Sequence, residues 1–545
     1  PTPYDPLEWA KKPLAERGRM ACEAWAIQGY GTPPAVFVVY LLKIALYIGG
    51  WVGFCAASGF RVADIASWWL EPLAFQKAIL WSMLFEGLGL GCGSGPLTGR
   101  YAPPFGGFLY FLRPGTTKLP FFRGAPIIGG ATRTWLDVAL YAATIGLLGR
   151  ALIAPALDPW HAIPIVWCAL ALGTCDRTTF LAFRGEHYWT TIVCFAFASH
   201  WIAGAKAVQL ALWFWAGVSK LNHHFPTVVC VMTSNGPLSR WAPLRKAMYR
   251  GYPRDLRPSR LAVTMGHLGT LLELGTPLVL AFAPGGWSLL LGMALMLALH
   301  GYITSNVPMG VPLEWNVMVV YGAFALFWAH PDVTVLDIAP LPVAAFLAVM
   351  LVAVPLIGNL KPGAVSFLCA MRYYAGNWAY GVWLFRGDSY RKLDRLTKSS
   401  PWVYDQLDRF YDRGTAVGLV GKVLAFRMMH LHGRALPVLV PKAVDRFEDY
   451  EYLDGEIVCG MVLGWNFGDG HLHDEKLVEN VQGQCCFEPG ELRCIFVEAQ
   501  PLFGRTMSWR IHDAATGRVA AGELDVAEMR ERQPWEAITA GSRGP

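Results

Sequence analysis

Residues 213–225 read WFWAGVSKLNHHF, and this stretch places a lysine, Lys220, at the end of an otherwise apolar run. Apolar runs of this kind cross a bilayer as helices, because a helix satisfies its own backbone hydrogen bonds. An ammonium group at the middle of a bilayer costs at least about 2.5–3.5 kcal/mol. Lys220 therefore needs a partner, a wet cavity or a chemical role, and it is the first candidate for a functional residue.

The composition of the whole chain also indicates a membrane protein. Of the 545 residues, 54% are hydrophobic and only 16% are charged, a balance outside the range usual for soluble domains. The formal net charge of +6 is modest and no DNA-binding motif is present, so nucleic acid is not an expected partner. The N-terminal residues mix acids and bases before the first apolar run, unlike a cleaved secretory signal. Membrane lipids are the expected partners.

Apolar runs long enough to span the hydrocarbon predict about ten membrane helices. They lie near residues 35–58, 74–94, 134–156, 163–182, 190–204, 206–222, 261–283, 286–303, 313–330 and 340–360. Ala205 and Lys206 interrupt the fifth and sixth runs, so a broken helix or a re-entrant pair is the alternative there. Basic residues crowd the connections at 100–133 and 240–260, which predicts that both connections and both termini are cytoplasmic.

Beyond Lys361 the composition becomes that of ordinary soluble proteins. The fold class is therefore a polytopic α-helical membrane protein with a small C-terminal soluble α+β or β-rich domain. We divide the chain into an N-terminal interfacial segment, a transmembrane domain, an interfacial helical linker and a soluble β-rich domain, at residues 1–34, 35–362, 363–444 and 445–545.

Two patterns define the C-terminal third. The linker has a predicted helix near 389–413 and a basic amphipathic stretch at 425–444 that we expect on the membrane surface. In the last domain apolar and polar residues alternate, which predicts strands. The alternating segments are EIVCGMVLGW, ELRCIFVEAQ and MSWRIHDAATGRVAAGELDV.

The predicted spans contain few ionisable residues, and those considered as site or pairing candidates are Lys43, Glu86, Asp176, Arg177, Lys220, His267, Glu273 and His300. Since buried charges have to be paired, we expect Asp176 and Arg177 to form a structural ion pair or a helix-end pair, and Lys43 either to snorkel or to meet Glu86. Glu273 precedes Pro277, which frees a backbone carbonyl and opens a polar pocket. His267 is six residues from Glu273, so the two do not share one helix face and do not form a metal site alone.

AGVSKLNHHF at 216–225 resembles the lysine-containing motif of the vitamin K-dependent γ-carboxylase superfamily, which includes the bacterial horizontally transferred transmembrane proteins. The following segments are similar in order, with Glu273 in LLELGTPLVLAF and His300 in LALHGYITSN. The resemblance covers about residues 190–330. It implies that Lys220 is the base that deprotonates a bound hydroquinone, that His300 hydrogen-bonds the developing oxygen charge, and that Glu273 shapes the pocket. His223 and His224 depart from the acidic–aromatic pair of the superfamily, and the C-terminal domain is much shorter.

The whole chain resembles a family of uncharacterised bacterial multipass membrane proteins through RYYAGNWAYGVWLFR (372–386), PLEWN (312–316) and GWNFGDGHLHDEK (464–476). This resemblance implies the bacterial cytoplasmic (inner) membrane. No metal is expected, because the residues with ligand chemistry in the last motif, His471, His473 and Asp474, are more often part of a solvated polar turn.

The sequence thus predicts a membrane-embedded enzyme that acts on a quinone, isoprenoid or acyl substrate, with Lys220 as general base. Burial favours the neutral amine, which is the form that accepts a proton. A quinone-like lipid is the suspected cofactor, and the residues expected near it are Trp213, Trp215, His223, His224 and His267. The alternative is a non-enzymatic lipid or small-molecule binding protein, a transporter or an accessory subunit, in a larger membrane complex or a homo-oligomer.

Overall fold

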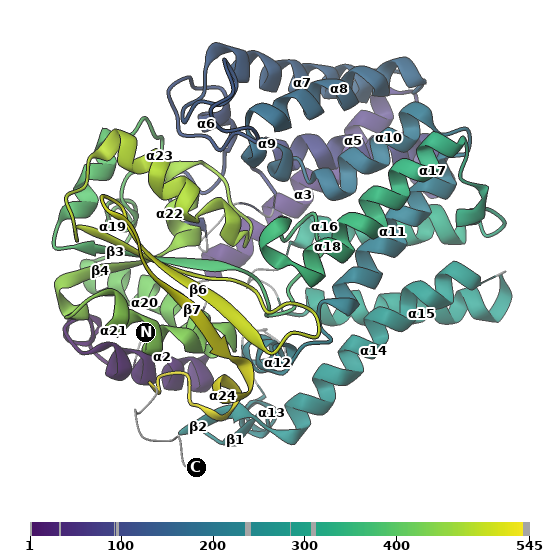
Figure 1. Ribbon diagram of the computed structural model, residues 1–545. Coiled ribbons are helices and arrows are strands. Elements are labelled where there is room, and N and C mark those ends of the chain that lie inside the picture. The colour runs from purple at the N-terminus through teal and green to yellow at the C-terminus, as the bar shows by residue number, and fades with distance from the viewer. Residues whose placement is uncertain are drawn as a thin grey trace.

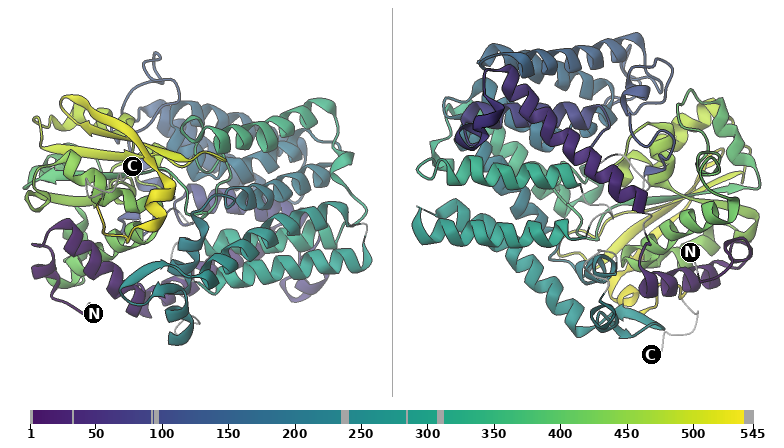
Figure 2. Two further views of the ribbon diagram at one scale, coloured as in Figure 1. Left: turned by 60° about the horizontal axis from the view of Figure 1, so that its bottom comes forward. Right: turned by 180° about the vertical axis from the view of Figure 1, so that it is seen from behind.

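The computed structural model describes residues 3–31, 34–91, 93, 98–234, 241–283, 285–306 and 312–537. It has two parts that lie side by side, a bundle of apolar helices and a part built on a β-sheet, which we call the soluble part after the domain predicted from its composition (Figures 1 and 2). Helices near both ends of the chain, α2 (Leu14–Gln28) and α24 (Val526–Glu531), belong to the soluble part. The predicted helical membrane protein with a small sheet region is confirmed in these terms.

Five helices of the described residues are long and apolar enough to cross a membrane. They are Val36–Ala57 in α3 (Pro34–Ala57), α7 (Trp135–Ile153), α14 (Arg260–Phe282), α15 (Gly286–Thr304), and Leu341–Leu360, which joins α17 (Leu341–Ala348) to α18 (Val354–Leu360). The bundle also contains shorter helices: α5 (Pro72–Gly87), α8 (Pro159–Cys175), α9 (Arg177–Ala182), α10 (Thr190–Phe197), α11 (Trp201–Val218) and α16 (Leu313–Gly322), which continues as a π-helix to Trp328. The count of about ten spans stays a prediction.

The chain around residue 200 is broken at a different place from the one predicted. Helix α10 ends at Phe197 and α11 begins at Trp201, whereas Lys206 lies inside α11. The ammonium of Lys206 donates to the carbonyls of His330 and Val333, at 2.7 and 2.5 Å. Because these carbonyls satisfy its charge, Lys206 does not interrupt the helix.

The soluble part is a five-stranded antiparallel sheet in the order β4-β3-β5-β6-β7. The strands are β3 (Tyr380–Arg386), β4 (Tyr450–Asp454), β5 (Leu492–Val497), β6 (Thr506–Asp513) and β7 (Gly517–Asp525). Successive side chains of a strand point to opposite faces. Accordingly, Tyr380 donates to the carbonyl of His432 on one face, and Trp383 donates to that of His473 on the other.

Helices cover both faces of this sheet (Figure 1). They are α20 (Arg413–Met429) and α21 (Leu436–Ala443) with α2, and α22 (Gly455–Val462) and α23 (Glu475–Cys485). The predicted strands in ELRCIFVEAQ and MSWRIHDAATGRVAAGELDV are present as β5, β6 and β7. The predicted strand in EIVCGMVLGW is wrong, because this segment forms α22, which Asp454 caps by accepting the backbone N–H of Glu456.

The segments expected in the linker also differ from the prediction. Strand β3, from residues 380–386, lies inside the sheet between β4 and β5. The predicted helix near 389–413 is replaced by a 3-10 segment, Ser389–Arg395, and by the short α19 (Val403–Leu407). Most of the basic stretch at 425–444 is buried within the protein, with Arg427 and Arg434 each about 1% exposed, and only its end near Lys442 is exposed. The ion pair of Arg427 with Asp454, at 2.9 Å, explains how its charge is tolerated there.

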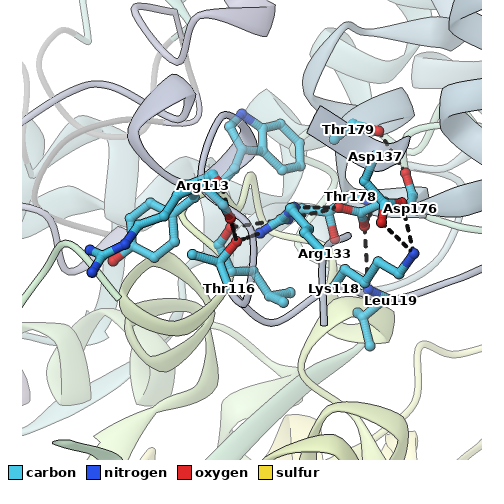
Figure 3. Close-up of polar contacts among 12 residues, drawn as sticks. Arg113, Thr116, Lys118, Leu119, Arg133, Asp137, Asp176, Thr178 and Thr179 are labelled. Carbon is cyan, nitrogen blue, oxygen red and sulfur yellow. Dashed lines mark hydrogen bonds and ion pairs between the residues drawn. The ribbon is translucent and has the colours of Figure 1, made fainter. Parts of the chain in front are cut away.

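The loop of residues 98–134 joins the bundle to the soluble part. Lys118 pairs with Asp137 on α7 at 2.7 Å, and Arg133 pairs with Asp176 at 2.7 Å (Figure 3). Asp176 also caps α9 through the backbone N–H of Thr178. The same loop reaches the soluble part, where Arg123 pairs with Glu479 at 2.6 Å. Lys118, Arg123 and Arg133 of this loop are therefore used within the protein.

Both ion pairs predicted within the spans have other partners. Asp176 pairs with Arg133 rather than with Arg177, and as the N-cap of α9 its carboxylate accepts the backbone N–H of Thr178, so its role is at a helix end. Lys43 pairs with Glu314, at 3.1 Å, rather than with Glu86. The second basic connection forms α13 (Ala242–Ala247) and the hairpin of β1 (Tyr249–Gly251) and β2 (Asp255–Pro258), and Arg240 lies outside the described residues.

Removing Arg133 tests the loop that joins the two parts. Arg133→Met leaves the buried Asp176 carboxylate without its cation, so we expect a loss of about 3–5 kcal/mol in unfolding free energy. The double variant Arg133→Met/Asp176→Asn is expected to recover part of this loss. The measurement is the unfolding transition of the full chain in detergent. Arg61→Met, at an exposed ion pair with Asp64, is the control and should leave the transition unchanged.

Candidate functional site

A cavity of about 400 Å³ lies where the bundle meets the soluble part. We call it the interface cavity, and six of its wall residues carry most of the argument: Trp213, Lys220, Glu273, His300, Tyr374 and Glu456. Helices α14 and α15 supply part of the wall from the bundle, and Tyr374, Phe426 and Glu456 supply part from the soluble side. Its volume is within the range of pockets that bury a small-molecule ligand.

The structure brings Lys220 and Glu273 together in this wall. Lys220 follows the end of α11, Glu273 lies on α14, and the ammonium and the carboxylate form an ion pair with both side chains buried. The lysine also donates to the carbonyl of Ala216 at 3.2 Å. Gly217 allows this geometry, since a Cβ there would lie within 2.8 Å of Leu274 and would push α14 away. The ion pair therefore depends on a close helix crossing.

His300 lies in the same wall but has no free nitrogen. Its Nε2 accepts from the indole N–H of Trp213 at 2.8 Å, and its Nδ1 is hydrogen-bonded to the side-chain carbonyl of Asn316. These partners fix the neutral tautomer with the proton on Nδ1. In this arrangement His300 orients Trp213 toward the cavity and does not offer a hydrogen bond to a ligand oxygen.

Four other residues predicted near a cofactor lie elsewhere. Trp215 donates to the carbonyl of Leu351 at 2.7 Å and is not in the cavity wall. His223 and His267 are exposed. His224 is buried against Gln500 of the soluble part, at 2.9 Å from its side-chain oxygen. Of the predicted group, only Trp213 reaches the cavity.

The wall contains charged residues that the sequence did not single out as site residues. Lys43 pairs with Glu314, and Arg184 pairs with Glu186 at 2.7 Å. The guanidinium of Arg184 lies over the ring of Trp315 at 5.4 Å, and over those of Tyr373 and Phe467 at similar distances. The motifs PLEWN, RYYAGNW and GWNFGDG contain several of these residues. The sequence signal that could have identified them was therefore the whole-chain resemblance and not the lysine motif.

Glu456 is the acidic residue that the soluble part contributes to the wall. Its Oε1 accepts the backbone N–H of Gly468 at 2.8 Å, and its Oε2 lies 3.6 Å from the Arg427 guanidinium. Burial raises the pKa of Glu456 to about 7, although Arg427 acts in the opposite direction. Both oxygens of Asp454 already accept hydrogen bonds from Arg427, at 2.9 and 3.0 Å. This pairing limits the effect of the Arg427 charge on the pKa of Glu456.

The metal candidates do not converge on one point. His471 pairs with Glu498 at 3.0 Å and with Asp469 at 3.3 Å, His473 is buried, and Asp474 caps α23. Within the described ranges no group of three or more His, Cys, Asp or Glu side chains is arranged to hold a metal ion. His471 instead fixes the loop that follows Gly468, next to the cavity.

His471 predicts a specific pH dependence of stability. Burial alone would lower its pKa, but the carboxylates of Glu498 and Asp469 raise the pKa to about 10. Because this value lies above the ordinary histidine pKa of about 6.5, the stabilisation is complete below about pH 6.5 and is lost as the pH rises toward 10. Thermal unfolding of the full chain between pH 6 and 10 should show this loss. In His471→Gln, the part of the slope due to this residue should be absent, and an unchanged slope would contradict the assignment.

Fold and site together define a polytopic membrane protein with an attached soluble part and a cavity between the two. The chain belongs to the family described as "Transmembrane protein of unknown function (DUF3556)", whose model matches residues 2–541. The predicted membership of an uncharacterised family of transmembrane proteins is confirmed to this extent. No curated protein matches the chain. No solved structure matches it.

Proposed function

We propose that the protein is a membrane-embedded enzyme that takes a lipophilic substrate into the interface cavity and removes a proton from it with Lys220. The observation that carries this proposal is a buried ion pair, Lys220 with Glu273, in the wall of a 400 Å³ cavity. Charges away from water are expensive, and those that border vacant volume are candidates for a functional site. The quinone, isoprenoid and acyl classes remain the candidate substrates.

The ion pair can deliver a neutral base without water. The Lys220 ammonium passes one proton to the Glu273 carboxylate, which gives a neutral amine and a carboxylic acid. The amine then accepts the proton of a substrate hydroxyl, and the substrate becomes an oxyanion beside the restored ammonium. One proton moves at each step and the total charge of the site is constant. The neutral amine is a competent base because its nitrogen carries a free lone pair that can accept a proton.

The other site residues have supporting roles in this proposal. Glu273 stores the proton, which extends the pocket-shaping role implied by the resemblance to the γ-carboxylase superfamily. His300 and Asn316 hold Trp213 as a flat wall beside the amine. The resemblance implies a hydrogen bond from His300 to the substrate, and that bond would require His300 to release Trp213. His300 is therefore a positioning residue here.

We also propose that the soluble part faces the cytoplasm of a bacterium. The basic connections favour this side by the positive-inside rule. They pack on the soluble part, where Arg123 pairs with Glu479, and where Arg245 donates to the carbonyl of Ile27 at 2.8 Å.

The competing function is a lipid or small-molecule binding protein without chemistry, or a subunit of a larger complex. The observation that favours this function is the same ion pair. Glu273 already compensates the charge of Lys220, so the lysine does not require a chemical role to be tolerated there. An enzyme and a binding protein differ in what a variant without the amine retains. The variant of an enzyme would retain unreacted substrate. The variant of a binding protein would either lose its ligand or keep the same ligand as wild type.

Lys220→Met separates these two functions. The variant keeps the length and apolar stem of the side chain but has no amine, so we expect a substrate to accumulate in the cavity that wild type converts. The measurement is mass spectrometry of lipids that co-purify with the full chain. We expect a species enriched by about tenfold or more in the variant, and a related product species in wild type.

Lys206→Met is the matched control, since it also removes a buried lysine, in this case one on α11 whose ammonium donates only to backbone carbonyls. The co-purifying lipids of this control should equal those of wild type. If Lys220→Met is folded and carries the same lipids in the same amounts as wild type, the enzymatic proposal is wrong.

A further inference from the structure

From the charges in its wall, we infer that the interface cavity selects lipids with an uncharged head group, such as a hydroxyl or a ketone, and excludes anionic head groups such as phosphate and carboxylate. The inference rests on the proposed function, because it names the substrate class of the same cavity. It narrows the candidates to quinol-like and isoprenoid alcohol-like molecules and removes fatty acids and acyl phosphates.

Every cation among the described wall residues already has a carboxylate. Lys43 has Glu314, Arg184 has Glu186 and Lys220 has Glu273. Glu186 and Glu314 are each about 1% exposed, so bulk water does not weaken these pairs. A negative head group would find no uncompensated positive charge, and it could gain one only by breaking a buried ion pair.

Among the wall residues that the structure describes, the soluble side adds a further carboxyl group and no further cation. Arg427 is bound by both oxygens of Asp454, and Glu456 lies 3.6 Å from the same guanidinium. Two carboxyl groups thus share one cation behind this part of the wall. When Glu456 is ionised, it repels an anion in the cavity, and when it is protonated, it can donate a hydrogen bond to a neutral oxygen.

The surrounding wall is suited to a neutral, partly flat molecule. Trp213, Tyr373 and Trp378 present aromatic side chains to the cavity, and Leu268 and Leu272 present aliphatic ones. Apolar groups gain free energy when they bury against such a surface, but an ion without a counter-charge does not. A substrate with a long hydrocarbon tail and one neutral oxygen function fits both the apolar wall and the paired charges.

The test uses three probes with the same hydrocarbon chain and different head groups: hexadecanol, hexadecanoate and hexadecyl phosphate. Binding to the full-length protein in detergent is measured by native mass spectrometry at pH 8, where both acidic probes are charged. We expect hexadecanol to bind at least about tenfold more tightly than either anion. Equal or tighter binding of an anionic probe would overturn the inference.

A gain-of-affinity variant makes the test independent of simple loss of fold. Glu314→Gln removes the carboxylate that pairs with Lys43, so the wall gains a cation without its counter-charge, and affinity for hexadecyl phosphate should rise by about tenfold. Glu479→Gln, which breaks the outer pair with Arg123, is the control and should leave the order of the probes unchanged. If Glu314→Gln is folded and does not raise this affinity, the charge argument is wrong.

The outcomes also separate this inference from the proposed function. A preference for hexadecanol, together with identical co-purifying lipids in wild type and Lys220→Met, supports the head-group inference and rejects the chemistry. A preference for an anion, together with substrate accumulation in Lys220→Met, supports the chemistry and rejects the head-group inference. Failure of all three probes to bind overturns the inference that this cavity selects lipids by their head groups.

Discussion

The need to compensate every buried charge is the constraint on which the rest of the structure depends. Arg133 with Asp176 and Lys118 with Asp137 hold the loop that joins the two parts, and Lys220 with Glu273 holds α11 against α14. An uncompensated charge at any of these places would cost several kcal/mol. The positions of the loop, the helices and the cavity wall are therefore coupled through ion pairs as well as through apolar packing.

The cavity is a consequence of how the two parts meet. Bundle helices bring apolar side chains and Lys220, while the soluble part closes the space with Tyr374, Phe426 and Glu456. A molecule that enters from the bilayer would meet aromatic surface and paired charges together. Under the proposed function, this combination would bury the hydrocarbon tail of a substrate while its polar group contacts the Lys220–Glu273 pair.

The sequence predicted the helical bundle and strands β5 to β7, because apolar length and alternation are local signals. It also selected Lys220, Glu273 and His300, which lie in one wall. It could not predict their pairing, or the partners of Lys43 and Asp176, because these depend on which helices touch. The prediction of a strand in the segment that forms α22 was wrong for a related reason. Its apolar residues are buried on all sides, and periodicity does not distinguish such a helix from a strand.

Three buried lysines show why the partner decides what a lysine can do. Lys77 donates to the carbonyls of Ala151, Leu152 and Ala154 at the end of α7, and Lys206 likewise donates only to backbone carbonyls. Carbonyls stabilise an ammonium but cannot take its proton. Lys220 differs, because Glu273 is a carboxylate that can accept a proton and return it. Under the proposed function this carboxylate gives the proton of Lys220 a route that does not pass through water, and among these three lysines only Lys220 combines a carboxylate partner with the wall of the interface cavity.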